Sequence, residues 1–152
     1  MVKTYIALGS NMHNRHRYIL NALRCIQEKV FITKISPFVF SRPAEDVKGG
    51  IFLNGVMEGV TKLSPQKLLK FLQVIEAKTG RNFPHEKGEQ RTIDLDIIFY
   101  DNKVIRDGTL IIPHFRYRQR DFVIIPLCEI APDFKDPETG ETIESLKTKE
   151  YV

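Results

Sequence analysis

The sequence predicts an α+β fold in which helices pack against an antiparallel sheet. Apolar residues alternate along several short stretches and repeat at helical spacing along two longer ones, and the stretches follow the order strand, helix, strand, strand, helix, strand. This βαββαβ order is that of the ferredoxin-like core. An extra hairpin and C-terminal helices complete αβα layers, and the length suits a single domain over residues 1–152.

The first elements follow from local signals. Residues 4–8 favour a strand, and Gly9-Ser10-Asn11 predicts a turn before a helix that Asn14 caps. Residues 31–40 predict a second strand, interrupted at Pro37. The apolar stripe of the helix contains Ile19, Leu20, Leu23, Ile26, Gln27 and Val30.

A third strand is expected over residues 51–61, after a loop over residues 41–50. Asn54 near its start either caps a turn or recognises a ligand, and the local pattern alone favours the turn. One face of this strand carries Phe52, Asn54, Val56 and Glu58.

The second helix begins at Ser64-Pro65, with serine as the N-cap and proline at the first helical position. Gly80 ends it, and residues 81–90 form a second loop. Its apolar stripe contains Leu68, Leu69, Leu72 and Ile75.

The C-terminal third predicts smaller elements. Asp101-Asn102 is expected at the tip of a hairpin that returns through residues 103–105. Residues 110–114 are extended, and residues 123–130 form a helix that stops before Pro132. The polar tail predicts a short hairpin around residues 137–140 and a final helical turn.

The strand over residues 91–99 carries the strongest chemical signal. Asp94 and Asp96 lie roughly 6.6 Å apart along one face, so both can reach two cations about 3.5–4 Å apart. A solvated acidic face is the alternative. The opposite face contains Ile93, Leu95, Ile97 and Phe99, whereas Ile98 and Tyr100 follow the aspartates.

Composition narrows the class of protein. The net charge of +4 favours anionic partners, either nucleotides or nucleic acid. No apolar run approaches the about 20 residues of a membrane span, and no signal peptide is evident, so we expect a cytoplasmic protein. Cys25 and Cys128 have no metal-site spacing and are expected to be buried thiols.

Basic residues accompany the acidic pair. Arg81 and Arg91 flank the second loop, and His114 and Arg120 lie on a later connection. Cations near a metal site can offset the charge of a nucleotide triphosphate during group transfer.

These motifs together resemble the 6-hydroxymethyl-7,8-dihydropterin pyrophosphokinase family. The matching pieces span about the first 134 residues in family order, and Arg-Thr-Ile-Asp-Leu-Asp is the most diagnostic. They are Ala7-Leu8-Gly9-Ser10-Asn11, Phe52-Leu53-Asn54, Ile75-Glu76, Gly80-Arg81, Arg91-Thr92-Ile93-Asp94-Leu95-Asp96, Pro113-His114, Arg120 with Phe122, Pro126-Leu127 and Glu129-Ile130-Ala131-Pro132.

The resemblance implies an ATP- and magnesium-dependent diphosphotransferase of folate biosynthesis. Asp94 and Asp96 would hold two Mg²⁺ ions, and Arg81 and Arg91 would steady the transferred and leaving phosphates. The residues it implies for ATP binding are Glu76, Arg91, Ile97, His114 and Arg120.

The resemblance also implies a pterin site. The flat ring would stack between Phe52 and Phe122, Pro43 would lie beside it, and Asn54 would read its amide-like edge. This context reverses the turn interpretation of Asn54.

Departures from the family pattern lie in the loops. Phe83 and Gly88 stand where an arginine and a tryptophan are usual, Glu89-Gln90 replaces Gly-Pro, and Arg42-Pro43-Ala44 replaces a Thr-Pro pattern. We expect an active but slower enzyme, limited by loop closure.

Two rival interpretations remain open. An RNA-binding module shares this element order and a basic charge, although the aspartates would repel phosphate without metal. Another two-metal nucleotidyl transferase or nuclease could use the same aspartates. We expect ATP and the pterin as partners, neither nucleic acid nor membrane, and a monomer, with a homodimer as the alternative.

Overall fold

The computed structural model describes residues 1–11, 14–42, 50–79 and 93–150. Strands β1, β2, β4 and β5 and helices α1 and α2 form the predicted βαββαβ core, which confirms the fold class. The elements are β1 (Val2–Ser10), α1 (Arg15–Ile26), β2 (Val30–Ile35), β3 (Val39–Ser41), β4 (Phe52–Thr61), α2 (Pro65–Lys78), β5 (Asp94–Tyr100), β6 (Ile105–Asp107), β7 (Leu110–Ile112), the 3₁₀ helix η1 (Tyr117–Gln119), α3 (Asp121–Ile130) and α4 (Ile143–Glu150).

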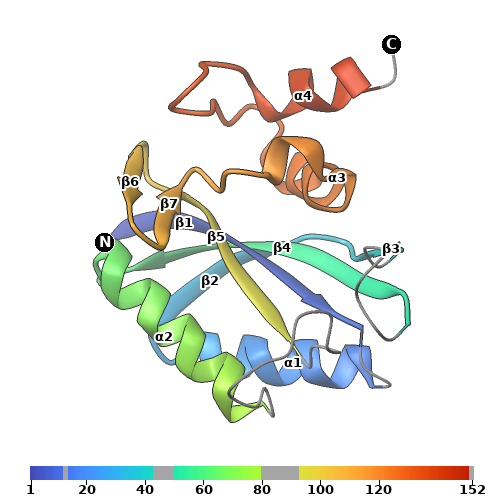
Figure 1. Ribbon diagram of the computed structural model, residues 1–152, viewed down its shortest axis with the longest axis vertical. Helices are drawn as coiled ribbons and strands as arrows, with labels where there is room; N and C mark the ends of the chain where they lie inside the picture. The colour runs from blue at the N-terminus through green and yellow to red at the C-terminus, as the bar shows by residue number, and fades with distance from the viewer. Residues whose placement is uncertain (12–13, 43–49, 80–92, 151–152) are drawn as a thin grey trace.

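The main sheet has the strand order β2-β4-β1-β5, and every neighbouring pair is antiparallel. Strand β3 also pairs with β4, near the start of β4. Helices α1 and α2 cover one face of the sheet, and α3 and α4 lie on the other face (Figure 1). The predicted αβα layers are therefore present.

Each face of the sheet has its own apolar core. Ile6, Leu8 and Met57 point toward α1 and α2, whose buried stripes include Leu23 and Leu72. The other face packs an aromatic cluster against α3 and α4. This second core contains Tyr5, Ala7, Val56, Ile98, Phe99, Tyr117, Val123, Ile124, Leu127, Ala131, Ile143 and Leu146.

Both core helices form close to their predicted positions. The Ser64 hydroxyl accepts a hydrogen bond from the Lys67 N–H at 3.3 Å, as its role as the N-cap of α2 requires. Asn14 precedes α1, but its side chain makes no capping hydrogen bond. Leu20 does not belong to the buried stripe of α1, because its side chain is 57% exposed. Val30 is predicted to belong to the same stripe, but it is the first residue of β2.

The predicted turn at Gly9-Ser10 is wrong, because both residues continue β1. Gly9 pairs with Asn54 on one side and with Asp94 on the other, and Ser10 pairs with Leu53. Strand pairing across three strands overrides the local turn preference of Gly-Ser.

The strict alternation predicted for β5 ends at a bulge. Ile97 pairs with Ile6 but Phe99 pairs with Tyr5, so Ile98 is an extra residue on β5. The bulge turns Phe99 toward α3 and α4, and Tyr100 packs with the α1 and α2 core. The prediction that Phe99 shares a face with Ile97 is therefore wrong.

A hairpin follows β5, but its tip differs from the predicted one. Asp101 makes a turn with a φ of 52°, yet the strand after it, β6, pairs with β7 rather than with β5. The hairpin closes after the Asp107–Leu110 pair, where Gly108 has a φ of 59°.

The tail forms the predicted short hairpin, and the final helix α4 is longer than the single predicted turn. Lys135 bridges to Thr142 around Gly140, whose φ is 76°, and Ile143 and Leu146 of α4 are buried in the second core.

Cys25 and Cys128 are free thiols, each only half-buried. Within the described residues, no helix combines the length and the apolar character that a membrane span needs.

Candidate active site between two cavities

Strand register gathers the predicted polar residues on one face of the sheet. Asn54 of β4 and Asp94 of β5 both pair with Gly9, so they lie in one row across three strands. In the next row on the same face, Ala7 pairs with Asp96. Strands lie about 4.8 Å apart, which brings Asn54 to within two strand spacings, about 10 Å, of Asp94.

Gly9 is required at the centre of that row. A Cβ atom at Gly9 would lie 2.8 Å from the Asn54 Oδ1 and 3.7 Å from the Phe52 ring. The Asn54 amide therefore occupies the space that a side chain at residue 9 would fill. Its Nδ2 donates to the Ser41 hydroxyl at 2.8 Å, and Asn54 is buried.

A first cavity of about 380 Å³ opens over this row. Its volume falls in the range of small-molecule sites, about 300–1,000 Å³. The cavity combines two aromatic rings, an amide, two carboxylates and two guanidinium groups. Its lining consists of Ala7, Leu8, Gly9, Ser41, Arg42, Phe52, Asn54, Gly55, Asp94, Asp96, Arg120, Phe122 and Val123.

A second, smaller cavity of about 170 Å³ adjoins β5. Its walls are mostly apolar, and the exposed ring of Phe115 forms part of them. Asp96 lines both cavities, so the two cavities are neighbours at this residue. The second lining consists of Leu69, Leu95, Asp96, Ile97, Thr109, Leu110, Ile111, His114 and Phe115.

The β5 bulge fastens His114 to the strand that carries the aspartates. The Ile98 carbonyl accepts the His114 N–H at 3.0 Å. On the other side of β5, the Thr4 hydroxyl donates to the Phe99 carbonyl at 2.7 Å. The bulge therefore places His114 beside the second cavity at a fixed distance along the strand from Asp96.

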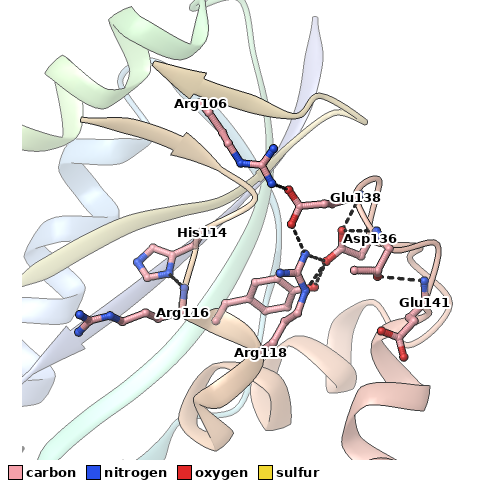
Figure 2. A network of polar contacts seen from close by, with 9 residues as sticks. Arg106, His114, Arg116, Arg118, Asp136, Glu138 and Glu141 are labelled. Carbon is pink, nitrogen blue, oxygen red and sulfur yellow. Dashed lines mark hydrogen bonds and ion pairs between the residues drawn. The ribbon is translucent and has the colours of Figure 1, made fainter. Parts of the chain in front are cut away.

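His114 is held in one tautomer. Its Nδ1 accepts the Arg116 N–H at 3.1 Å, so the proton of the neutral ring lies on Nε2 (Figure 2). Burial lowers the pKa of the imidazole to about 4, and the positive charges of Arg120 and Arg116 act in the same direction. At neutral pH His114 is an uncharged hydrogen-bond donor.

This assignment predicts the titration of His114. Because its pKa is about 4 when folded and 6.5 for an ordinary histidine, the unfolded chain takes up the proton first as the pH falls. The stability that neutral His114 contributes is complete above pH 6.5 and declines between pH 6.5 and 4. A ¹⁵N NMR titration should show Nε2–H and no protonation above about pH 5. A midpoint near 6.5 would contradict the assignment.

Arg120 connects η1 to α3 and lines the first cavity. Its carbonyl accepts the N–H groups of Val123 and Ile124 at 2.9 and 3.0 Å, so the residue is held at the start of α3. Its guanidinium carbon lies 5.6 Å from the centroid of the Phe122 ring. Arg120 therefore lies over the ring of Phe122, one of the two phenylalanines predicted to stack on the pterin.

Glu76 contacts the backbone between the two aspartates. Its carboxylate accepts the Leu95 N–H at 2.9 Å, a bond from α2 to the edge strand β5. Glu76 therefore supports the strand that presents Asp94 and Asp96.

Three predicted site residues, Pro43, Arg81 and Arg91, lie outside the described residues, as do the departures at Phe83, Gly88 and Glu89-Gln90. The structure brings the others to the two cavities, with Glu76 on the β5 backbone. Phe52, Asn54, Asp94, Arg120 and Phe122 line the first cavity, Ile97 and His114 line the second, and Asp96 lines both.

Sequence reasoning missed Phe115, Ser41 and the steric role of Gly9. A glycine within a β-rich run signals close approach of another group, so Gly9 could have been recognised. Phe115 follows Pro113-His114 but shows no periodicity, and Ser41 becomes a partner of Asn54 only through the pairing of β3 with β4.

The aspartates suit Mg²⁺, which takes oxygen ligands and is usually bound by one or two carboxylates together with substrate phosphates. Among the residues that the structure describes, no group of three or more histidine, cysteine or acidic side chains could hold a metal alone. Asp94 and Asp96 therefore fit a metal site that phosphate oxygens and water complete.

Comparison with known proteins points to the same family as the sequence motifs. Residues 5–132 match the family described as 7,8-dihydro-6-hydroxymethylpterin-pyrophosphokinase. The 2-amino-4-hydroxy-6-hydroxymethyldihydropteridine pyrophosphokinase of Haemophilus influenzae is 39% identical over 97% of this chain and 92% of its own length. The Aquifex aeolicus protein of the same name is 37% identical over 97% of this chain and 91% of its own.

Other relatives are longer proteins. The chain is 42% identical to the Pneumocystis carinii folic acid synthesis protein fol1 but spans only 20% of it. Plasmodium falciparum HPPK-DHPS has the same fold, with a TM-score of 0.76 and 14% identity over 98% of this chain and 44% of that one. On the family match and the near full-length relatives, the chain belongs to the 7,8-dihydro-6-hydroxymethylpterin-pyrophosphokinase family.

Proposed function

We propose that the chain transfers the pyrophosphoryl group of ATP to the hydroxymethyl oxygen of 6-hydroxymethyl-7,8-dihydropterin and releases AMP. One observation carries the assignment of sites: Asp96 lines both cavities, and Asp94 lines the first. Ligands in the two cavities would meet at these carboxylates. Proximity of two bound reactants is itself a large part of catalysis in group transfer.

The first cavity suits the pterin. A planar ring is favoured between aromatic side chains, and Phe52 and Phe122 both line this cavity. The Asn54 amide offers a donor and an acceptor to the amide-like edge of the ring. Gly9 leaves room for that amide, and Ser41 orients it. Pro43 belongs to the same proposed site.

The second cavity suits the base of the nucleotide. Its apolar walls include Ile97, Ile111 and the exposed ring of Phe115, which can stack on a base. His114 provides a neutral Nε2–H donor in this cavity. Arg120 lines the first cavity, so its guanidinium would contact phosphates that extend from the base toward the aspartates, with two N–H groups. Glu76 supports this site through the β5 backbone.

Asp94 and Asp96 would hold two Mg²⁺ ions together with the triphosphate. When bound, the ions neutralise phosphate charge that would otherwise oppose attack by the pterin oxygen. Arg81 and Arg91 would steady the transferred and leaving phosphates. Phe52 and Phe122 hold the ring, and Asn54 sets its orientation, so that the hydroxymethyl group faces the aspartates.

The test is a product assay. The chain is incubated with ATP, MgCl₂ and 6-hydroxymethyl-7,8-dihydropterin, and nucleotides and pterins are separated by anion exchange. We expect AMP and the pterin diphosphate in equal amounts, and no AMP without the pterin. ADP with a pterin monophosphate, or AMP with free pyrophosphate, would contradict the proposed function.

A further inference from the structure

A buried carboxylate outside both cavities connects the C-terminal tail to the active site. Asp136 has no exposed surface, and its Oδ2 accepts the Tyr117 hydroxyl and the Arg118 Nε and Nη2, the last two at 3.0 and 2.5 Å. Its Oδ1 accepts the N–H groups of Glu138 and Thr139 at 2.7 and 3.3 Å. Five donors thus converge on one side chain.

The network extends to the β6-β7 hairpin. Arg118 Nη2 also donates to Glu138 Oε1 at 3.1 Å, and Arg106 of β6 pairs with Glu138 Oε2. Figure 2 shows Arg106, Glu138, Arg118 and Asp136 in one continuous chain of contacts. Three segments that are distant in sequence are therefore joined: β6, η1 and the tail hairpin that contains Asp136 and Glu138.

Tyr117 and Arg118 lie within the segment of residues 114–120, from which His114 and Phe115 line the second cavity and Arg120 lines the first. The Tyr117 N–H donates to the His114 carbonyl at 3.4 Å, and the Tyr117 carbonyl accepts the Arg120 N–H at 3.1 Å. The segment is fixed at its start by the Ile98 carbonyl and in its middle by Asp136. Its position relative to β5 depends on both attachments.

The same contacts neutralise one of the three arginines of the segment. Arg116, Arg118 and Arg120 alternate along five residues, and Arg118, which lines neither cavity, pairs with the Asp136 and Glu138 carboxylates. Burial alone raises the pKa of the Asp136 carboxyl. Hydrogen bonds from Tyr117, the Glu138 N–H and Arg118 outweigh burial and leave the pKa below its ordinary value. The carboxylate is therefore charged at neutral pH.

We infer that Asp136 is a positioning residue for nucleotide binding, which acts through Tyr117 and Arg118 on His114 and Arg120. This rests on the proposed function, because His114 and Arg120 are its nucleotide ligands. The tail beyond α3 then contributes to ATP affinity as well as to packing.

The experiment compares Asp136→Asn with Glu58→Gln. Asparagine keeps the shape and the acceptor for the backbone N–H groups, but an amide NH₂ would face the Arg118 guanidinium. Glu58 is also a buried carboxylate that accepts a tyrosine hydroxyl, from Tyr5 at 2.7 Å, yet it contacts β1 and β2 rather than the segment. Its variant controls for loss of a buried charge.

We expect calorimetry to show magnesium–ATP binding about 10-fold weaker in Asp136→Asn, because a factor of about ten corresponds to the loss of roughly one hydrogen bond from His114 or Arg120 to the nucleotide. The KM for ATP should rise by a similar factor, with kcat changed less. In Glu58→Gln the ATP affinity should stay within about 2-fold of wild type at a comparable loss of stability to urea. Tyr117→Phe, which keeps the buried ring, should shift the affinity in the same direction by a smaller factor.

Equal ATP affinities in Asp136→Asn, Tyr117→Phe and Glu58→Gln would overturn the inference, since Asp136 would then serve stability alone. If Asp136→Asn does not fold, Tyr117→Phe decides between these outcomes. Wild-type protein that binds no magnesium–ATP would refute the proposed function first, and the positioning role with it. The wild-type arm therefore distinguishes the two failures.

Discussion

Asp96→Asn is expected to lower kcat by about 10³-fold or more, because metal-assisted charge stabilisation contributes several kcal/mol to group transfer. Asp96 is half-buried and lines both cavities, and asparagine keeps its shape while removing the charge. Asp94→Asn should have an effect of the same kind from within the first cavity. Steady-state AMP release at saturating magnesium measures both.

Asp107→Asn is the matched control. Asp107 is an exposed aspartate at the end of β6 and lines neither cavity, so its loss should change kcat less than 2-fold, roughly the scale of surface substitutions. Thermal unfolding of all three variants should stay close to wild type. An Asp96→Asn enzyme whose kcat lies within tenfold of wild type would remove the basis of the metal site.

Asn54→Ala is expected to weaken pterin binding by about 10–100-fold. The amide is buried over the first cavity, and leaving a polar edge of the bound ring without its partner costs about 1–3 kcal/mol. Gly9→Ala should act in the same direction, because the new Cβ would lie 2.8 Å from the Asn54 Oδ1. Quenching of pterin fluorescence gives the dissociation constants.

Two controls separate recognition from folding. Asn102→Ala removes an exposed asparagine from the turn after β5 and should leave the pterin dissociation constant unchanged. Ser41→Ala removes only the hydroxyl that holds the Asn54 amide, so its effect should be smaller than that of Asn54→Ala. Pterin affinity that is unaltered in Asn54→Ala would exclude the amide as the reader of the ring.

The order of the core elements was predictable because each carries a local signal. Ser64 and Pro65 mark the start of α2, and Leu68, Leu72 and Ile75 recur at helical spacing and are buried. The alternation of β4 likewise places Val56 in the second core and Leu53 and Met57 in the first. These signals depend on residues close together in sequence.

The errors arise where partners are distant in sequence. The bulge at Ile98 is set by pairing with Tyr5 and Ile6, and Gly9 is extended because it lies between β4 and β5. Leu20 reads as part of an apolar stripe, but its direction relative to the sheet leaves it exposed. Periodicity gives no information about these pairings.

The residues of the candidate site also fall into two groups: those that the local sequence pattern predicts and those that depend on distant partners. The Asp94 and Asp96 pair is visible as a period-two pattern in an apolar strand, whereas the local pattern around Asn54 favours a turn. The resemblance to a family corrected that interpretation, and the structure adds the reason the amide fits: a glycine opposite and a serine on β3. The side-chain contacts of the Asp136 network join residues that lie 18 to 32 positions apart, so no single stretch of the sequence predicts the network.

The central claim is that Asp94 and Asp96 lie between a bound pterin and a bound nucleotide. A crystal structure with magnesium, a non-hydrolysable ATP analogue and the hydroxymethyl pterin measures this directly. We predict the pterin ring between Phe52 and Phe122, the base against Phe115 and Ile97, and magnesium on both aspartates. Magnesium bound away from Asp94 and Asp96, or a pterin outside the first cavity, would contradict the account.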